Sequence, residues 1–101
     1  MGFLDVFKKK SGQSGGLYSG GKGGSIEDAI LVNAETTVIG VHAEYEYVAS
    51  KHGARGVDWE LETQSLLNHE GKYYDALHIK MMKDGEEFTY YFDISNFFGK
   101  F

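Results

Sequence analysis

Four titratable side chains with complementary acid–base chemistry occur at alternating positions in the second half of the chain. If the three extended segments there pair in order, Glu62, His78 and Tyr91 form one row on the outer face of a sheet, and Asp93 lies one row away. A carboxylate beside an imidazole and a phenol can transfer protons. The same pattern is typical of a solvated sheet face, stabilised by cross-strand pairs such as Glu62–His78. We favour this second interpretation, because a flat face lacks the concavity of a small-ligand site.

Two further patterns resemble binding sites. His42 and Glu46 are four residues apart on a predicted helix, a spacing that can hold a metal ion when a third ligand joins them, but no third ligand is evident in the sequence. The glycine-rich stretch 19–24 resembles a phosphate-binding loop, yet it lacks the preceding strand and the Gly-Lys-Ser/Thr of such loops. The chain also has no cysteine. The sequence therefore predicts neither a metal site nor a cofactor.

Charge is distributed unevenly along the 101 residues. In residues 1–24, four lysines against one aspartate give +3, whereas residues 25–101 carry six basic and fourteen acidic residues, giving −8. An acidic domain repels phosphate backbones and attracts basic surfaces. We therefore expect no nucleic-acid binding through residues 25–101, and a protein partner that is basic.

The N-terminal part divides into two segments. Residues 1–10 read as a short amphipathic segment with a basic end; it either makes a weak membrane contact, packs on a partner, or is an ordinary frayed terminus. Residues 11–24 contain seven glycines and three serines and are predicted to be a flexible, disordered linker. Residues 25–101 then form a single domain. The sequence has no secretory signal and no membrane-spanning apolar run, so we expect a cytoplasmic protein.

The first half of the domain contains one clear helix and one ambiguous segment. Residues 25–34 begin like a capping box but contain a short continuous apolar run, so they are either a helix or an extra strand. Residues 41–52 are predicted to be helical and to end at Gly53. The expected buried stripe, at spacings of three and four, consists of Val38, Val41, Tyr45, Val48 and His52.

The second half alternates with period two and predicts three strands, at about 57–67, 73–81 and 87–94. A two-residue turn at Asp84-Gly85 would set Met81 opposite Phe88. For the first hairpin we expect a three-residue loop, 69–71, because a two-residue loop would mix the two faces. The predicted fold class is α+β: a three-stranded antiparallel meander with one face covered by one or two helices.

The aromatic C-terminus has two interpretations. Phe97, Phe98 and Phe101 either close the edge of the core or form a docking patch. The function expected from the whole pattern is a non-enzymatic protein-interaction module with an acidic surface; the alternative is a small ligand-binding protein or hydrolase that uses the Glu62, His78, Tyr91 and Asp93 cluster. The candidate partner-binding residues are Glu60, Glu62, His78, Glu87, Tyr91, Asp93, Phe97, Phe98 and Phe101.

Overall fold

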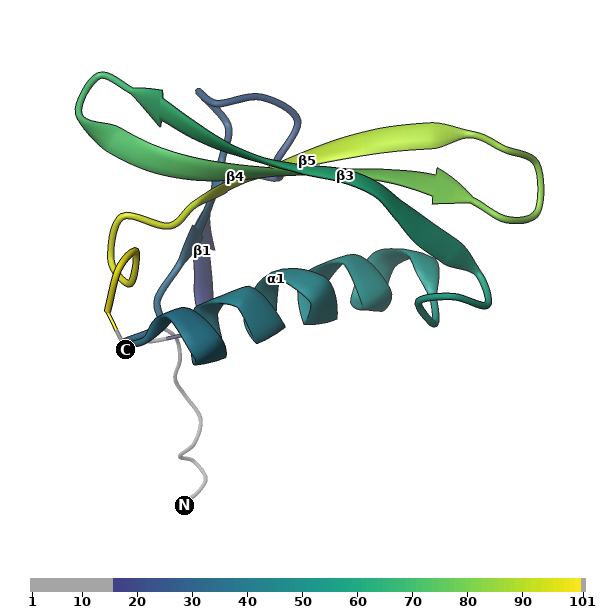
Figure 1. Cartoon of the computed structure of the whole chain (residues 1–101), viewed down its shortest axis with the longest axis horizontal. Coiled ribbons are helices and arrows are strands. Elements are labelled where there is room, and N and C mark those ends of the chain that lie inside the picture. The colour runs from purple at the N-terminus through teal and green to yellow at the C-terminus, as the bar shows by residue number, and fades with distance from the viewer. Residues whose placement is uncertain (1–15, 101) are drawn as a thin grey trace, which may run out of the picture.

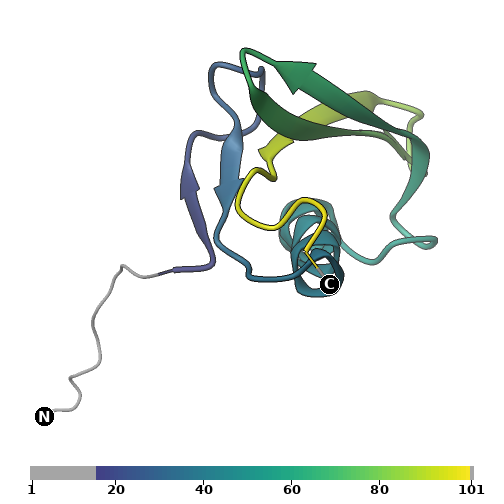
Figure 2. The same ribbon diagram turned by 60° about the vertical axis from the view of Figure 1, so that its left-hand side comes forward.

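The computed structural model describes residues 16–100. One helix packs against a mixed five-stranded sheet, which curves around it (Figures 1 and 2). The α+β class is confirmed, but the sheet has five strands instead of three. The elements in chain order are β1 (Tyr18–Gly20), β2 (Ile30–Val32), α1 (Thr37–His52), β3 (Trp59–His69), β4 (Lys72–Met81) and β5 (Glu87–Asp93).

The predicted meander is present as β3–β4–β5, and a second hairpin extends it. The spatial order is β1-β2-β5-β4-β3, with β2 parallel to β5 and the other neighbours antiparallel. The ambiguous segment 25–34 therefore contains a strand. Its capping-box residues make only a turn, in which the Asp28 N–H donates to the Ser25 hydroxyl oxygen at 3.2 Å.

The predicted linker does not extend to Gly24. Residues Tyr18–Gly20 form strand β1, and the Tyr18 hydroxyl donates to the Ala43 carbonyl of α1 at 2.6 Å. Gly20 has φ +80°, and a Cβ there would lie 2.9 Å from the Ala29 carbonyl oxygen. Some of the glycines therefore serve close packing, which composition alone does not reveal. The predicted segment 1–10 and linker residues 11–15 lie outside the described residues.

Helix α1 begins four residues before the predicted start and presents a different face to the sheet. The Thr36 hydroxyl caps it by accepting from the Ile39 N–H at 3.3 Å, and Gly53 ends it with φ 105°. The predicted stripe is wrong at its beginning, because Val38 is 74% exposed. The helix is turned so that Gly40 faces Phe97; a Cβ on Gly40 would lie 2.4 Å from that ring. Its buried residues are Gly40, Ala43, Glu44 and Val48.

The β3–β4 turn has two residues, and the predicted three-residue loop is wrong. Glu70 and Gly71 both have positive φ, 52° and 80°, as a type I′ turn requires. Without a further irregularity, this turn would place inward-facing side chains of β3 opposite outward-facing side chains of β4. A bulge between Leu61 and Thr63 restores the match of faces. Beyond the bulge the predicted faces of β3 are exchanged, so that Leu67 pairs with Tyr74 on the outer face.

The β4–β5 loop is longer than predicted. Met81 pairs with Glu86 through an N–H···O bond of 2.7 Å, and the Gly85 N–H donates to the Met81 carbonyl at 2.9 Å, which leaves a four-residue loop. Ile79 therefore lies opposite Phe88, where a two-residue turn would place it opposite Tyr90. The shift is two residues, so each side chain keeps its predicted face.

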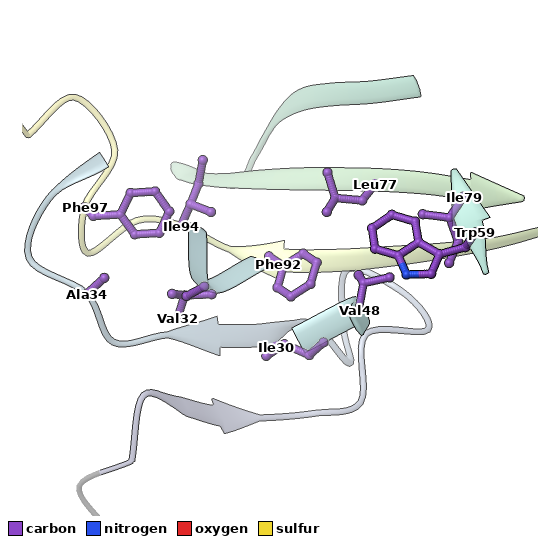
Figure 3. Close-up of a cluster of buried hydrophobic side chains, with 11 residues drawn as sticks. Ile30, Val32, Ala34, Val48, Trp59, Leu77, Ile79, Phe92, Ile94 and Phe97 are labelled. Atoms are coloured by element: carbon purple, nitrogen blue, oxygen red, sulfur yellow. The ribbon is translucent and has the colours of Figure 1, made fainter. Parts of the chain in front are cut away.

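The hydrophobic core lies between α1 and the concave face of the sheet (Figure 3). Trp59 is fully buried, as its position in the alternating pattern predicts, and its indole N–H donates to the Gly53 carbonyl at 2.7 Å. Within residues 16–100, no helix has the length and apolar character needed to cross a membrane. The buried cluster is Ile30, Val32, Ala34, Ala43, Val48, Trp59, Leu77, Ile79, Phe92, Ile94 and Phe97.

Candidate functional site

The predicted acid–base row does not form on the outer face. The bulge and the two-residue shift place Thr63 and Thr89 on either side of His78, in the positions predicted for Glu62 and Tyr91. His78 instead contacts the Glu87 carboxylate through Nε2 at 2.5 Å and the Thr89 hydroxyl through Nδ1 at 2.7 Å. The register therefore separates the residues that this chemistry requires.

The other predicted site residues on the outer face do not form a cluster either. Tyr91 lies opposite Ala76, while Asp93 is buried and lies 3.6 Å from the Lys72 ammonium. A cleft of about 410 Å³ opens beside Asp93. Asp93 is the only one of the predicted site residues that lines this cleft. Its lining is Gly20, Ile26, Glu27, Ala29, Leu31, His69, Glu70, Lys72, Tyr74 and Asp93.

The structure also places the His42 and Glu46 pair and the aromatic C-terminus. His42 Nε2 lies 3.8 Å from Glu46 Oε2 on the exposed side of α1, and no group of three metal-ligating side chains converges in residues 16–100. In the C-terminal turn, Phe97 is buried in the core, whereas Phe98 is 40% exposed and stacks on Tyr73 with ring centroids 4.2 Å apart. Phe101 lies outside the described residues.

The most unusual chemistry is inside the domain, where two carboxyl groups face each other between α1 and β4. Glu44 is completely buried and Asp75 is 6% exposed. Within the described residues, neither carboxyl oxygen of Glu44 has a hydrogen-bond partner. We call Glu44 and Asp75 the carboxyl pair. An unsatisfied buried acid is costly, and natural proteins retain such groups mainly where they have a role.

Burial determines the protonation state of the carboxyl pair. Loss of hydration, together with the adjacent Asp75 carboxyl, raises the pKa of Glu44 to about 10. Burial also raises the pKa of Asp75, while Gln64 opposes that shift by donating from Nε2 to Asp75 Oδ2 at 3.4 Å. Glu44 is consequently a neutral acid at pH 7.

Hydrogen bonds and strand pairing connect the elements that surround the carboxyl pair. The Tyr45 hydroxyl donates to Gln64 Oε1 at 2.6 Å, which joins α1 to β3. Leu66 follows Gln64 on the same face and lies opposite Asp75. At the other end, the Thr37 hydroxyl donates to the Phe97 carbonyl at 3.2 Å and joins the start of α1 to the C-terminal turn.

Apolar side chains that are fully or partly open to solvent lie along these connected elements. Val38, Leu66 and Phe98 are 74%, 55% and 40% exposed, and the aromatic or aliphatic side chains between them are half-buried. We call this set the apolar rim. It consists of Val38, Val41, Tyr45, Leu66, Tyr73 and Phe98. Large apolar side chains gathered on one surface are typical of interaction sites.

The apolar rim borders an open strand edge. β3 is the outermost strand, and past Trp59 no strand of residues 16–100 lies beside it. Such an edge offers unpaired N–H and C=O groups to an incoming segment. Glu60 and Glu62 stand at its N-terminal end, next to the bulge, so the edge is acidic there.

Sequence reasoning missed the carboxyl pair, although one signal was present. Asp75 interrupts the alternation of Tyr73, Leu77 and Ile79, so a carboxylate occupies a core-facing position. The predicted stripe, which is centred on Val41 and Tyr45, leaves Glu44 on the exposed side of the helix. Glu44 is four residues from both Gly40 and Val48, but this spacing indicates burial only when Gly40 is known to be buried.

Comparisons of the chain with protein families, with curated proteins and with solved structures gave no match. The geometry of the site is therefore the only guide to its function.

Proposed function

We propose that this protein is a non-enzymatic interaction module that binds a basic segment of a partner protein on the apolar rim and the adjacent β3 edge. The observation that carries this proposal is a group of six apolar side chains beside a buried carboxyl pair, of which Val38, Leu66 and Phe98 are exposed and the other three are half-buried. Apolar contact area supplies affinity, and the open backbone of β3 supplies hydrogen bonds.

Charge favours a basic partner. Residues 25–101 have a net charge of −8, and Glu60 and Glu62 lie on the edge beside the apolar rim. Such charges speed encounter with a basic segment and discourage pairing with neutral or acidic strands. The geometry gives the hydrolase alternative less support, because His78, Glu62 and Tyr91 are in different rows.

The proposal is tested by mapping the surface with matched variants after a partner has been captured from the native cells. Leu66→Asp places a charge in the apolar rim and should weaken binding at least tenfold. Val57→Asp is the control, since Val57 is even more accessible than Leu66, at 71% against 55% exposed, but lies outside the rim. Equal affinities of the two variants would exclude the rim as the binding surface.

A second pair of variants tests the acidic edge. Glu60→Lys combined with Glu62→Lys should lower the association rate more than it raises the dissociation rate, and high salt should weaken binding of the wild type. Glu27→Lys is the control, since Glu27 lines the cleft beside His69, at the end of β3 opposite to Glu60 and Glu62. Binding that is indifferent to salt and to both reversals would show that charge has no part in recognition.

A further inference from the structure

The cleft beside Asp93 lies apart from the apolar rim, on the face of the sheet that is turned away from α1. Its floor is a row of paired residues on neighbouring strands, Leu31, Asp93 and Tyr74. The connection between β1 and β2 lies next to the β3–β4 turn, and these two segments form the walls (Figures 1 and 2). Its volume of about 410 Å³ is in the range of small-molecule sites.

Backbone hydrogen bonds hold the wall formed by the β1–β2 connection in place. The Gly21 N–H donates to the Ala29 carbonyl at 3.0 Å, and the Gly23 N–H donates to the Asp28 carbonyl at 2.7 Å. The Tyr91 N–H of β5 donates to the Gly23 carbonyl at 2.9 Å and fixes the connection to the sheet. A ligand therefore meets a cleft that is already formed, which lowers the entropy cost of binding.

The carboxylate at the centre of the floor has an incomplete set of partners. Asp93 is 8% exposed, and its Oδ1 accepts a hydrogen bond from the Ser95 N–H at 3.0 Å. Within the described residues, the cation nearest to Oδ2 is the Lys72 ammonium at 3.6 Å, farther than the roughly 2.7–2.9 Å of a charge-assisted hydrogen bond. A buried carboxylate with one weakly contacted oxygen favours a cationic ligand.

The lining as a whole has an excess of negative charge. Three of its residues are acidic, Lys72 is basic, and His69 is counted as neutral, so three carboxylates against one ammonium leave −2. Glu70 is 3.6 Å from the His69 ring, whereas residues 16–100 provide no cation for Glu27. A ligand that neutralises the cleft therefore carries two positive groups, one for Asp93 and one for Glu27.

The rest of the lining is mainly apolar. Ile26, Ala29 and Leu31 supply aliphatic surface, and Tyr74 supplies an aromatic ring. A methylene chain gains free energy when it is buried on such surface, and an ammonium group gains from a neighbouring tyrosine ring. The lining thus suits an alkyl chain that joins two cationic ends.

We propose that this cleft binds a free aliphatic diamine, with one ammonium group at Asp93 Oδ2, the other at Glu27, and the methylene chain along Leu31 and Tyr74. A lysine side chain of the proposed basic partner has the same alkylammonium chemistry. It carries a single positive charge, however, so it would leave Glu27 without a cation. The second charge of the cleft favours the free diamine.

The test is a titration of the ¹⁵N-labelled full chain with cadaverine, followed by NMR. The amides of Leu31, Lys72 and Tyr74 should shift, whereas that of Val57, which does not line the cleft, should not. Pentylamine, which has one ammonium group, should bind at least tenfold more weakly, and the uncharged pentanediol should cause no shifts. Equal affinities for cadaverine and pentylamine, or shifts that do not include the cleft, would overturn the proposal.

Variants assign the two ammonium positions. Asp93→Asn keeps an acceptor for the Ser95 N–H and should weaken both amines. Glu27→Gln changes an exposed side chain, so it should fold normally and weaken cadaverine at least fivefold without affecting pentylamine. Glu35→Gln is the control, because it removes the same charge from an exposed residue outside the cleft. Equal weakening of cadaverine by Glu27→Gln and Glu35→Gln would show that net charge alone attracts the amine and would refute the site.

A last comparison separates the free diamine from a lysine of the partner. Glu27→Lys places a cation at the cleft and should abolish the shifts caused by cadaverine while partner binding keeps its wild-type affinity. If Glu27→Lys also weakens partner binding tenfold, a side chain of the partner occupies the cleft and the proposal is wrong. The effect of Leu66→Asp on partner binding is measured independently, so the proposed function stands or falls separately.

Discussion

Glu44 has an environment that opposes the usual behaviour of its side chain. In the unfolded chain its carboxyl group ionises near pH 4.5, whereas in the folded domain burial raises the pKa to about 10. The folded state therefore binds one more proton than the unfolded state across that interval. Because its folded pKa is raised, the stability associated with Glu44 is fully present below pH 4.5 and is lost as the pH rises towards 10.

The first prediction follows from the direction of this pH dependence. Between pH 7 and pH 9 the free energy of unfolding of the wild type should fall by about 1–3 kcal/mol, since each unit of pH changes it by up to about 1.4 kcal/mol. Glu44→Gln keeps the shape of the side chain without the charge, so it should remove most of this slope and stabilise the domain at pH 9. Urea unfolding at several pH values measures the effect.

The control for this measurement is Glu46→Gln, on the exposed side of the same helix. It should leave the slope unchanged. The chosen interval lies above the range in which His52 titrates, because burial lowers the pKa of that imidazole below 6.5. A Glu44→Gln protein that retains the full slope would show that another group is responsible.

At the scale of single residues, the sequence predicts burial well where hydrophobicity and position agree. Trp59 is an example, since it is both apolar and on the core-facing side of its strand. The sequence fails where they disagree. Nothing in the residue types indicates that Glu44 is buried, because a carboxylate in a helix is normally solvated and only the packing of Phe97 on Gly40 fixes the helix rotation.

At the scale of elements, alternation predicts that a strand exists but not its partner residues. A register shift of two residues keeps every side chain on the same face, so the two-residue and four-residue forms of the β4–β5 loop satisfy the pattern equally well. The β3–β4 hairpin is different, because there a bulge compensates for the turn. A bulge has no strong sequence signal, and for this reason the faces of β3 beyond Leu61 were predicted wrongly.

The loop between β4 and β5 gives the second prediction. Gly85 has φ 76°, a conformation that a β-branched residue strongly disfavours. Gly85→Val should therefore cost about 1–3 kcal/mol of unfolding free energy, measured by chemical denaturation. Lys83→Val in the same loop is the control and should cost much less, since Lys83 has no positive φ. An unchanged melting temperature for Gly85→Val would mean that the turn has another conformation.

Strand β1 gives the third prediction and distinguishes a strand from a flexible linker. Tyr18→Ala removes both the hydrogen bond to Ala43 and the edge contact with the Tyr47 ring, whose centroid lies 5.1 Å away. It should lower the free energy of unfolding by about 2 kcal/mol, whereas Tyr18→Phe, which loses the hydroxyl alone, should cost about 1 kcal/mol. If neither change affects thermal melting, β1 does not contribute to the fold.

At the scale of the whole molecule, the meander and its covering helix were predictable because their contacts are local in sequence. Strands β1 and β2 were not, because they are three residues long and depend on β5, which is distant in the chain. The sequence left β2 open between helix and strand, and the glycine content of the stretch that contains β1 indicated a linker. The apolar rim was beyond prediction, since α1, β3, β4 and the C-terminal turn all contribute to it.

The fourth prediction concerns the charge of the whole domain. Residues 25–101 carry −8, and this field should oppose the approach of phosphate backbones. We expect the full chain to show no retardation of duplex DNA or of single-stranded RNA in gel-shift assays at physiological salt. Tight binding under those conditions, especially if it persists after Lys8, Lys9 and Lys10 are replaced by Ser, would refute the expectation.

The parallel pairing of β2 with β5 has a consequence for how the domain folds. Ile30 pairs with Phe92, so the central strand β5 and its neighbour β2 come from opposite ends of the domain. The β3–β4 hairpin can form early from local contacts, whereas β2 must wait for the last strand, and closing that long loop should limit the folding rate. During synthesis, Ile30 and Val32 can pair with β1, but the other edge of β2 has no partner strand until β5 has left the ribosome. We expect the nascent chain to be most susceptible to aggregation, and to recognition by chaperones, in this interval.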